Sequence, residues 1–325
     1  MASERANAVA GKLADKLVVL FGGTGYFGAN VAQELLKRGA RLRIVSRHPE
    51  QAWKLKPLAN LGQLQFVRAD LTQTASLPAI VTGAHAVVNL VGAFTGDLDT
   101  LHVKAPAALA AAAKDAGVEA LVHISANGAN AHSPVDYART KAEAEVAVLA
   151  AFPAATILRP SVIFGPDDKF INLFAGLISA LPVLPVFGPE AKFQPVFIDD
   201  AAAAVANALS DPGKLGGKTF ELVGPEVYTM AQLNRKIAAA QGRTRLFVDL
   251  PDAVGGLIAA LTGWLPGAPL SRDQFALLTA GNISSGLPGL KALGVAAHPL
   301  ELFLDRWMLR YRNHGRFGDK RDPAG

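Results

Sequence analysis

The 325-residue sequence contains no cysteine, which removes several kinds of chemistry at once. Without thiols there can be no disulfide, no thiolate metal site, no iron–sulfur ligand and no cysteine nucleophile. Charged residues are also scarce at 18%, whereas apolar residues make up 50% of the chain. A disordered or fibrous chain would be far more polar, so this composition predicts a globular protein of one or two domains with a sizeable core.

An excess of one charge is lacking too, because 32 Lys and Arg residues stand against 27 Asp and Glu residues, a net charge of +5. Such a small excess permits an anionic partner without identifying one. No ladder of basic and aromatic residues indicates nucleic acid. The seven histidines show no metal-ligand spacing with carboxylates, and His123 lies in an apolar run, where we expect it to pack in the core. We therefore expect neither nucleic acid nor a metal ion.

No hydrophobic run is long enough, without interruption, to predict a membrane span. Residues 170–189 and 253–271 are uncharged, but the first stretch contains three prolines and the second contains two. We expect each to be a buried helix followed by an apolar loop. Charged residues before the first apolar run argue against a secretory signal. A soluble protein with a possible membrane-facing surface is the expectation.

Short apolar runs alternate with helical patterns over the first 160 residues. The apolar runs are residues 16–21, 41–46, 63–68, 86–91, 120–124 and 155–158, and the helical patterns are residues 27–38, 105–116 and 137–151. This alternation predicts an α/β fold, a Rossmann-type doubly wound parallel sheet covered on both faces. We expect residues 1–160 to form an NAD(P)-binding core. Residues 161–325, with predicted helices at 171–180, 198–209 and 230–241 and a strand at 220–223, should form a smaller irregular region, interleaved with the core, that offers a substrate or partner surface.

The first predicted strand runs into a glycine-rich turn that opens a helix. In such a turn, backbone N–H groups at the positive end of the helix dipole can approach a pyrophosphate. Gly22 would make the tight turn, Gly25 would allow the close approach, and Gly28 would let the helix and strand pack. We therefore predict that the turn binds a dinucleotide through Gly22, Thr24, Gly25, Tyr26, Phe27 and Gly28.

The ends of the next strands supply further candidates, because ligands of open α/β sheets bind at the carboxyl ends of strands. After the second strand, where an acidic residue would bind the ribose of NAD, the chain has Ser46 and Arg47. A guanidinium pairs well with a 2′-phosphate, so NADP(H) is favoured over NAD(H). Asp70 could accept a hydrogen bond from the adenine amino group or cap the segment that follows it. The remaining residues predicted to line the cofactor are Leu71, Leu90, Val91 and Gly92.

A possible catalytic group follows the fifth strand. Tyr137 and Lys141 are four residues apart in a predicted helix and so share one face. A nearby ammonium would lower the pKa of the phenol and orient the nicotinamide ribose, which makes Tyr137 a candidate general acid or base. Ser125, directly after a strand, could polarise a substrate oxygen.

Taken in order along the chain, these motifs resemble the short-chain dehydrogenase/reductase superfamily, in its extended or atypical branch. The matching segments are residues 22–28, 70–71, 125, 137–141, 158–166 and 195–200. The resemblance spans most of the chain and implies Ser125, Tyr137 and Lys141 as the catalytic trio. It also implies that Pro160 and Val162 contact the cofactor.

The C-terminal segments 280–286, 293–295, 299–301 and 310–315 resemble, more narrowly, the NADPH-binding accessory subunits of respiratory complex I and their bacterial relatives. This resemblance implies an NADPH held for structural or regulatory reasons and complex I subunits as partners. It also implies a peripheral position on the cytoplasmic side of a bacterial inner membrane or on the matrix side in mitochondria. From residue 305 onward, six Lys and Arg residues against three Asp, with interleaved aromatics, predict contact of this tail with an anionic membrane, as does the apolar stretch 253–265.

Two other functions remain open at this point. The chain could be an active NAD(P)-dependent oxidoreductase or sugar-nucleotide-type epimerase that uses Tyr137 and Lys141. It could instead be an NADPH sensor that binds a partner according to its nucleotide state. Because Ser125, Tyr137 and Lys141 are all present, they could either turn over a substrate or only hold the nicotinamide ribose.

Overall fold

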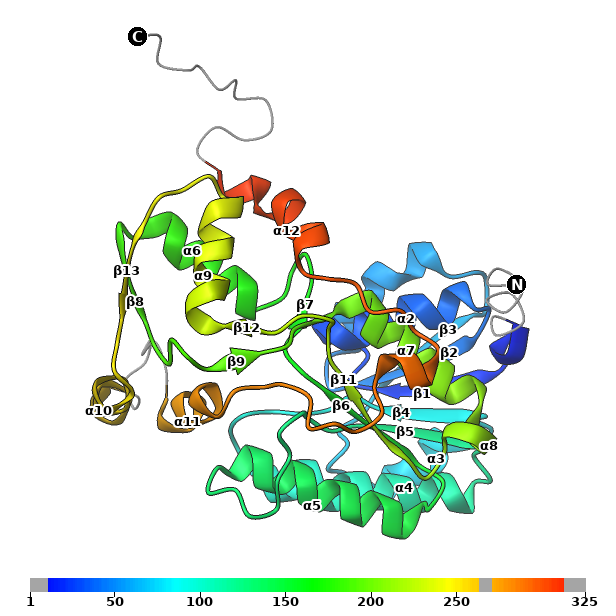
Figure 1. Ribbon diagram of the computed structural model, residues 1–325. Helices are drawn as coiled ribbons and strands as arrows, with labels where there is room; N and C mark the ends of the chain where they lie inside the picture. Colours follow the sequence, from blue (N-terminus) through cyan, green and yellow to red (C-terminus); the bar gives the residue numbers. More distant parts are fainter. Residues whose placement is uncertain (1–10, 263–270, 313–325) are drawn as a thin grey trace. The chain divides into compact units, whose positions relative to one another are not determined.

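The computed structural model describes residues 11–262 and 271–312 (Figure 1). The chain forms two compact units, each assembled from separate stretches of sequence. The first, here called the sheet unit, comprises Met1–Ile163, Ile198–Val223 and Ser284–Ala297. The second unit comprises Phe164–Phe197, Gly224–Ile283 and His298–Gly325.

A seven-stranded parallel sheet forms the centre of the sheet unit, with strand order β11-β6-β5-β4-β1-β2-β3. The strands are β1 Leu17–Phe21, β2 Arg41–Ser46, β3 Leu64–Arg68, β4 Ala86–Asn89, β5 Ala120–Ile124, β6 Thr156–Pro160 and β11 Thr219–Leu222. The chain order reverses at β1, which lies between β2 and β4. Ligands of doubly wound sheets bind at such a switch point. The predicted fold class is confirmed.

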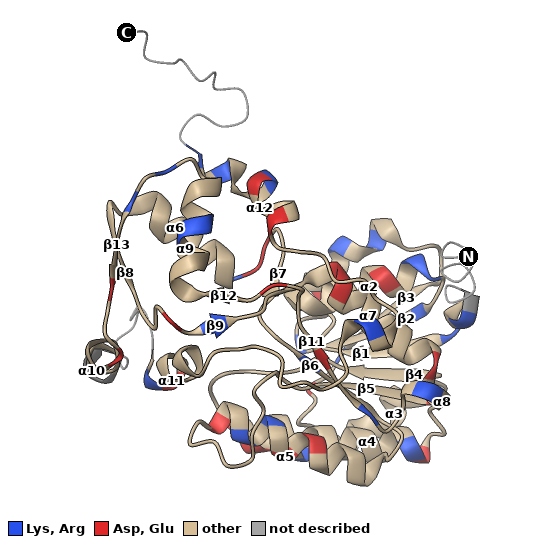
Figure 2. Ribbon diagram, in the orientation of Figure 1, with Lys and Arg blue, Asp and Glu red and all other residues tan. Residues whose placement is uncertain are grey.

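The central strands are buried because they carry no charge. Strands β1, β4 and β5 contain no Lys, Arg, Asp or Glu, and they are uniformly tan in Figure 2. Val18, Val19 and Leu20 of β1 are fully buried. Continuous apolar runs of this kind suit a parallel sheet that is covered on both faces.

Helices cover the two faces of this sheet (Figure 1). Helices α2 Tyr26–Lys37 and α7 Ile198–Ser210 pack together on one face, and α3 Leu77–Val81, α4 Ala105–Asp115 and α5 Asp136–Ala151 lie on the other. Shorter helical segments of the unit are η1 Gly11–Leu13, η2 Pro49–Leu58, η3 Thr74–Ser76, η4 Asp99–Lys104, α8 Pro212–Leu215 and η5 Leu290–Leu293. The sequence analysis predicted the long helices, but it placed no element at η2 or at the π-helical turn η4.

Two late segments of the chain complete the sheet unit. Strand β11 adds the seventh strand beside β6. The buried carboxylate of Glu221 in this strand accepts hydrogen bonds from the hydroxyl groups of Ser284 and Ser285, each at 2.7 Å. Asn207 of α7 donates to the carbonyl oxygen of Leu293 at 2.7 Å. These polar contacts hold residues 284–297 against strand β11 and helix α7 of the same unit.

The second unit contains shorter elements. Strands β8 Val183–Val186 and β13 Leu246–Asp249 pair in parallel, and β9 Lys192–Phe193 pairs antiparallel with β12 Tyr228–Thr229. The helices are α6 Phe170–Ala180, α9 Met230–Ala240, α10 Asp252–Thr262, α11 Arg272–Ala280, α12 Glu301–Met308 and η6 Leu309–Tyr311. Strand β7 Ile163–Phe164, whose first residue still belongs to the sheet unit, pairs with β10 Val196–Phe197. Thr229 caps α9 through a reciprocal pair of hydrogen bonds with Gln232.

The expectation that both uncharged stretches would form buried helices is wrong for one side of each helix. Helix α6 buries Ile171, Ala175 and Ile178, which share one face because residues three and four apart in a helix lie on the same side. Leu173 lies outside this face and is 51% exposed. In α10 the side chain of Leu257 is 59% exposed. None of the described helices is long and apolar enough to cross a membrane. Residues 263–270 and 313–325, which include most of the basic tail, lie outside the described part of the chain.

Candidate functional site

Two glycines of the turn after β1 are required by the packing of the protein itself. Gly22 has a φ of +84°, a conformation that favours glycine. A Cβ atom at Gly28 would lie 2.2 Å from the carbonyl oxygen of Gly22, so any side chain there would push helix α2 away from the turn. Both observations agree with the roles that the sequence analysis gave these residues.

Gly25 is different because no contact within the described part of the chain demands a glycine there. Its φ is −70°, and an added Cβ would approach only the carbonyl oxygen of Gly22, at an ordinary contact distance of 3.5 Å. Gly25 is also the N-cap residue of α2, where backbone N–H groups and the helix dipole favour an anion. A side chain at Gly25 would therefore meet little of the protein itself, although it would occupy the space beside the N-terminus of α2.

Polar groups gather at the ends of β2 and β3, beside this turn. The hydroxyl oxygens of Ser46 and Thr24 lie 3.1 Å apart. Arg47 is exposed, and its guanidinium makes no hydrogen bond with another residue in the described part of the chain. The pKa of Asp70 is lowered, mainly by a hydrogen bond from the backbone N–H of Thr72 and further by the charge of Arg47. Asp70 therefore caps its own turn and also lies near Arg47.

Arg68 is a second guanidinium at this edge that the sequence analysis missed. It lies opposite Ser46 in the parallel register of β2 and β3. It donates to the carbonyl oxygen of Arg47 at 3.1 Å and pairs with Glu50 at 3.0 Å. The register of the two strands brings it to Arg47, and the spacing of residues along the chain does not reveal that register.

Lys141 connects helix α5 to the end of β5 and lies close to the loop after β4. Its side chain is buried, and its ammonium donates to the carbonyl oxygen of Ile124 at 3.0 Å. A Cβ at Gly92 would lie 3.3 Å from the Lys141 nitrogen, so the two elements meet here. Burial lowers the pKa of Lys141 to about 8, and the nearby charge of Glu145 opposes that effect.

The expectation that Lys141 lowers the pKa of Tyr137 is wrong. Burial of the phenol raises the pKa of Tyr137 to about 12. Its ring stacks on Phe94, with ring centroids 4.4 Å apart, and meets the edge of His102 at 5.7 Å. The cost of placing a phenolate among these rings exceeds any attraction to the ammonium, so Tyr137 is a neutral proton donor at physiological pH.

Ser125 is engaged by a buried ion pair instead of facing a substrate oxygen. Its hydroxyl donates to Glu145, whose carboxylate also accepts two hydrogen bonds from Arg159, at 2.8 and 2.6 Å. Ser125 and Glu145 are 3% and 7% exposed. Because a carboxylate only accepts, the single hydroxyl proton of Ser125 is committed to this pair. The sequence analysis missed both Glu145 and Arg159, although Glu145 lies one helical turn after Lys141.

His123 lies in the core, as predicted. It is 1% exposed in β5, and its Nδ1 atom is 3.1 Å from the side-chain nitrogen of Asn89. Burial lowers its pKa well below the usual value. A second buried histidine, His102, was not singled out from the sequence. Within residues 11–262 and 271–312, no group of three or more His, Asp or Glu residues could hold a metal ion.

The other residues predicted to contact a cofactor lie at the same edge of the sheet. They lie at or just beyond the carboxyl ends of β3, β4 and β6, and they are Leu71, Leu90, Val91, Pro160 and Val162. The backbone of Leu90 meets the glycine turn, because its carbonyl carbon would be 3.1 Å from a Cβ at Gly22. One edge of the sheet unit therefore brings together the turn, the basic residues and the Tyr137–Lys141 pair.

Comparison with family models gives a match to the NmrA-like family over residues 14–258. Among curated proteins, the chain is 33% identical over 307 residues to "NADH dehydrogenase [ubiquinone] 1 alpha subcomplex subunit 9, mitochondrial" of Mus musculus, covering 92% of this chain and 81% of that one. The protein of the same name from Arabidopsis thaliana is 31% identical over 317 residues, with 92% and 79% covered.

Solved structures share the fold at lower identity. An NADPH-dependent quinone oxidoreductase from Escherichia coli, solved with NADPH, has a TM-score of 0.71 at 20% identity and covers 89% of this chain and 99% of its own. A triphenylmethane reductase of Citrobacter sp., complexed with NADP(H), has a TM-score of 0.72 at 20% identity, with the same coverage. These similarities extend over nearly the whole of each solved chain.

Proposed function

Since the chain belongs to the NmrA-like family, an NAD(P)-binding family that matches three quarters of its length, we propose that it binds NADP(H) as an accessory subunit of respiratory complex I. In this proposal the nucleotide is held mainly as a structural element. The observation that carries nucleotide binding is Gly25, a glycine for which the protein's own packing gives no reason. The names of the mouse and Arabidopsis relatives support respiratory complex I as the partner.

Each part of the nucleotide has a matching group in the sheet unit. The turn from Gly22 to Gly28 would bind the pyrophosphate, and Arg47, beside Arg68, would bind the 2′-phosphate, which is the reason to favour NADP(H). The Asp70 oxygen that is not bonded to Thr72 could accept from the adenine amino group. The nicotinamide ribose would then lie beside Tyr137 and Lys141.

Structural retention is favoured over turnover by the state of the three residues that a reductase would use. NADPH would supply a hydride, but the substrate oxygen would also need hydrogen-bond donors. The proton of Ser125 is committed to Glu145, and one face of the Tyr137 ring is stacked on Phe94. Lys141 can still bind the ribose, so the trio suits a binding role.

We further propose that the second unit supplies the surface for partners, on the inner face of an energy-transducing membrane. Exposed leucines on α6 and α10, such as Leu173 and Leu257, favour an apolar partner surface. The basic residues after residue 305 would add attraction to anionic lipid, at about 1 kcal/mol each.

A matched pair of glycine variants tests nucleotide binding. Gly25→Ser introduces a side chain into open space at an N-cap position, where serine is preferred, so the fold should be at least as stable. The same side chain would occupy the predicted pyrophosphate space, and NADPH affinity should fall at least about tenfold. Gly28→Ala should instead lower the melting temperature, because its Cβ has no room.

The measurement has two parts. Nucleotide released from heat-denatured wild-type protein is identified by chromatography, and NADPH affinity is measured by calorimetry. Wild-type protein should release NADP(H), and Gly25→Ser should be folded but empty. A folded Gly25→Ser protein that retains its nucleotide would contradict the proposed site.

A further inference from the structure

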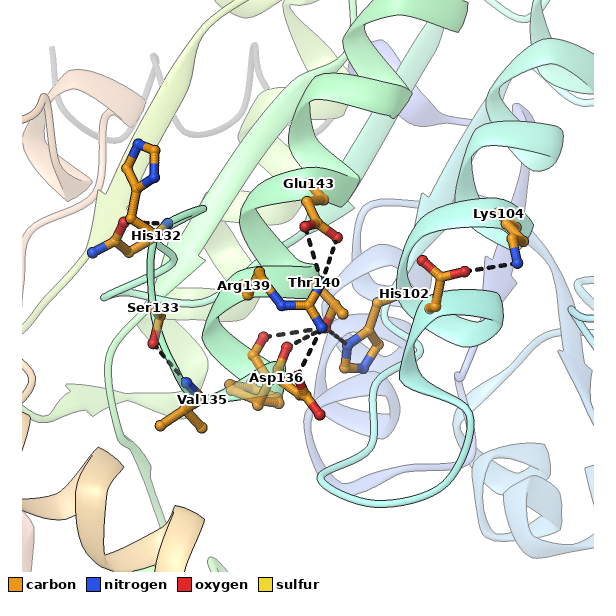
Figure 3. Close-up of polar contacts among 12 residues, drawn as sticks. His102, Lys104, His132, Ser133, Val135, Asp136, Arg139, Thr140 and Glu143 are labelled. Carbon is orange, nitrogen blue, oxygen red and sulfur yellow. Dashed lines mark hydrogen bonds and ion pairs between the residues drawn. The ribbon is translucent and has the colours of Figure 1, made fainter.

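His102 makes two hydrogen bonds to two different elements of the candidate site. It lies in η4, is 1% exposed, and points toward helix α5 (Figure 3). The backbone N–H of Ala93, in the loop after β4, donates to Nε2 of His102 at 3.1 Å. On the other side of the ring, Nδ1 lies 2.9 Å from the hydroxyl oxygen of Thr140 in α5.

The partners determine which nitrogen of the ring carries the proton. Nε2 accepts from a backbone N–H, so it is unprotonated. The hydroxyl of Thr140 donates to the carbonyl oxygen of Asp136 at 2.7 Å, so its oxygen is left to accept from Nδ1–H. His102 is therefore neutral, with its proton on Nδ1. Burial and the charge of Lys141 act in the same direction and lower its pKa to about 4.

The bridge joins the two elements whose residues surround the predicted nicotinamide ribose. The loop carries Gly92 and Phe94, and α5 carries Tyr137 and Lys141. A Cβ at Gly92 would lie 3.3 Å from the Lys141 nitrogen and 3.9 Å from Nε2 of His102, so loop, helix and imidazole converge at one point.

We propose that His102 is a positioning residue for the nicotinamide half of the bound nucleotide. It holds the loop after β4 at a set distance from α5, and the nicotinamide ribose occupies the space that this distance defines. The adenine half is bound by the glycine turn and by Arg47, which have no contact with His102 in the hydrogen bonds described. This inference rests on the proposed nucleotide binding and adds a residue to it.

Two ligands separate a positioning role from a general effect on the fold. NADPH has both halves, whereas adenosine 2′,5′-bisphosphate has only the adenine half with its 2′-phosphate. In His102→Phe, which keeps the ring volume and removes both hydrogen bonds, NADPH affinity should fall about tenfold, as expected for a lost hydrogen bond that leaves a buried N–H unpaired. Affinity for adenosine 2′,5′-bisphosphate should stay within about twofold. The fluorescence of bound NADPH should also shift toward that of free NADPH.

Three further variants keep the test decisive. His102→Gln has an amide oxygen that can accept and an amide nitrogen that can donate, so it should recover most of the NADPH affinity. Thr140→Val removes the acceptor of Nδ1 from the other side and should show the same selective loss without changing the histidine. His85→Phe, the same substitution at the far end of β4, is the control and should leave both ligands unaffected.

The outcomes are distinguishable from those of the proposed function. If the wild-type protein binds neither ligand, nucleotide binding itself is refuted, and this inference falls with it. If the wild-type protein binds both but His102→Phe or Thr140→Val weakens both equally, or weakens neither, the positioning role is wrong and nucleotide binding stands.

Discussion

Replacing Lys141 with methionine should stabilise the folded protein while it weakens the nucleotide site. Lys141 is 3% exposed and donates to one carbonyl oxygen, that of Ile124. Burial lowers the pKa of Lys141 from 10.5 to about 8. Keeping this lysine charged in the folded protein therefore costs free energy that methionine, of similar length and without charge, does not cost.

The size of the effect follows from the two pKa values. Each pH unit between them corresponds to 1.36 kcal/mol, so the charged lysine costs about 3 kcal/mol at pH 7. Losing the hydrogen bond to Ile124 offsets about 1–2 kcal/mol of that gain. Lys141→Met should then be more stable than the wild-type protein by about 1–2 kcal/mol at pH 7.

The sign of the pH dependence is the stricter test. Between pH 8 and 10.5 the unfolded chain binds a proton at Lys141 that the folded chain has released, so wild-type stability rises with pH in this window. The methionine variant lacks this contribution. Its advantage should be largest below pH 8, and at pH 9.5 the cost of the wild-type lysine should have fallen to about 1.4 kcal/mol.

Urea unfolding of both proteins at pH 7 and pH 9.5 measures this directly, and NADPH titration reports the loss at the site. The control is Lys114→Met, an exposed lysine of α4, whose effect should not change between the two pH values. A Lys141→Met protein that is less stable than wild type at pH 7, or whose difference from wild type is the same at both pH values, would refute the reasoning.

Three further predictions follow from the site and the tail. Arg47→Glu should weaken NADPH much more than NADH, because a charge-assisted pair becomes a repulsive one, and equal losses in calorimetry would remove Arg47 from the 2′-phosphate site. Tyr137→Phe should cost only about 1 kcal/mol of NADPH affinity, and a substrate whose turnover collapses in this variant would instead favour the oxidoreductase or epimerase function. In cell fractionation, high salt should release the protein from membranes and deletion of residues 310–325 should leave it in the soluble fraction, whereas full-length protein found there at low salt, without respiratory subunits, would contradict membrane association.

Local patterns in the sequence predicted the sheet and the glycine turn well. The strands were visible because runs such as residues 86–89 and 120–124 are continuously apolar, which is the signature of burial on both faces. The turn at residues 22–28 could be predicted because the positive φ of Gly22 and the close contact of Gly28 with the Gly22 carbonyl oxygen are local features of the chain. The capping of α9 by Thr229 is local in the same way.

Features that depend on burial or on distant partners could not be predicted. The sign of the pKa change at Tyr137 is set by its burial among residues distant in the chain, such as Phe94, which is 43 positions away and stacks on its ring. Spacing from Lys141 alone pointed the wrong way. The contact of Ser125 with the Glu145–Arg159 pair required the packing of α5 on β6. His102 has no motif around it, and its importance comes from the two elements it joins.

The sheet unit cannot be completed until most of the polypeptide has been made. Its seventh strand, β11, ends at Leu222, and residues 284–297 are attached through Glu221 and Asn207. The glycine turn at residues 22–28 is synthesised early. More than 250 further residues must be synthesised before residues 284–297, the last segment of the same unit, leave the ribosome. During synthesis the growing chain would expose the edge of β6, an open parallel strand of the kind that invites wrong pairing. For this protein, we therefore expect premature termination before Leu222, which leaves β6 as the edge strand, to yield aggregation or degradation.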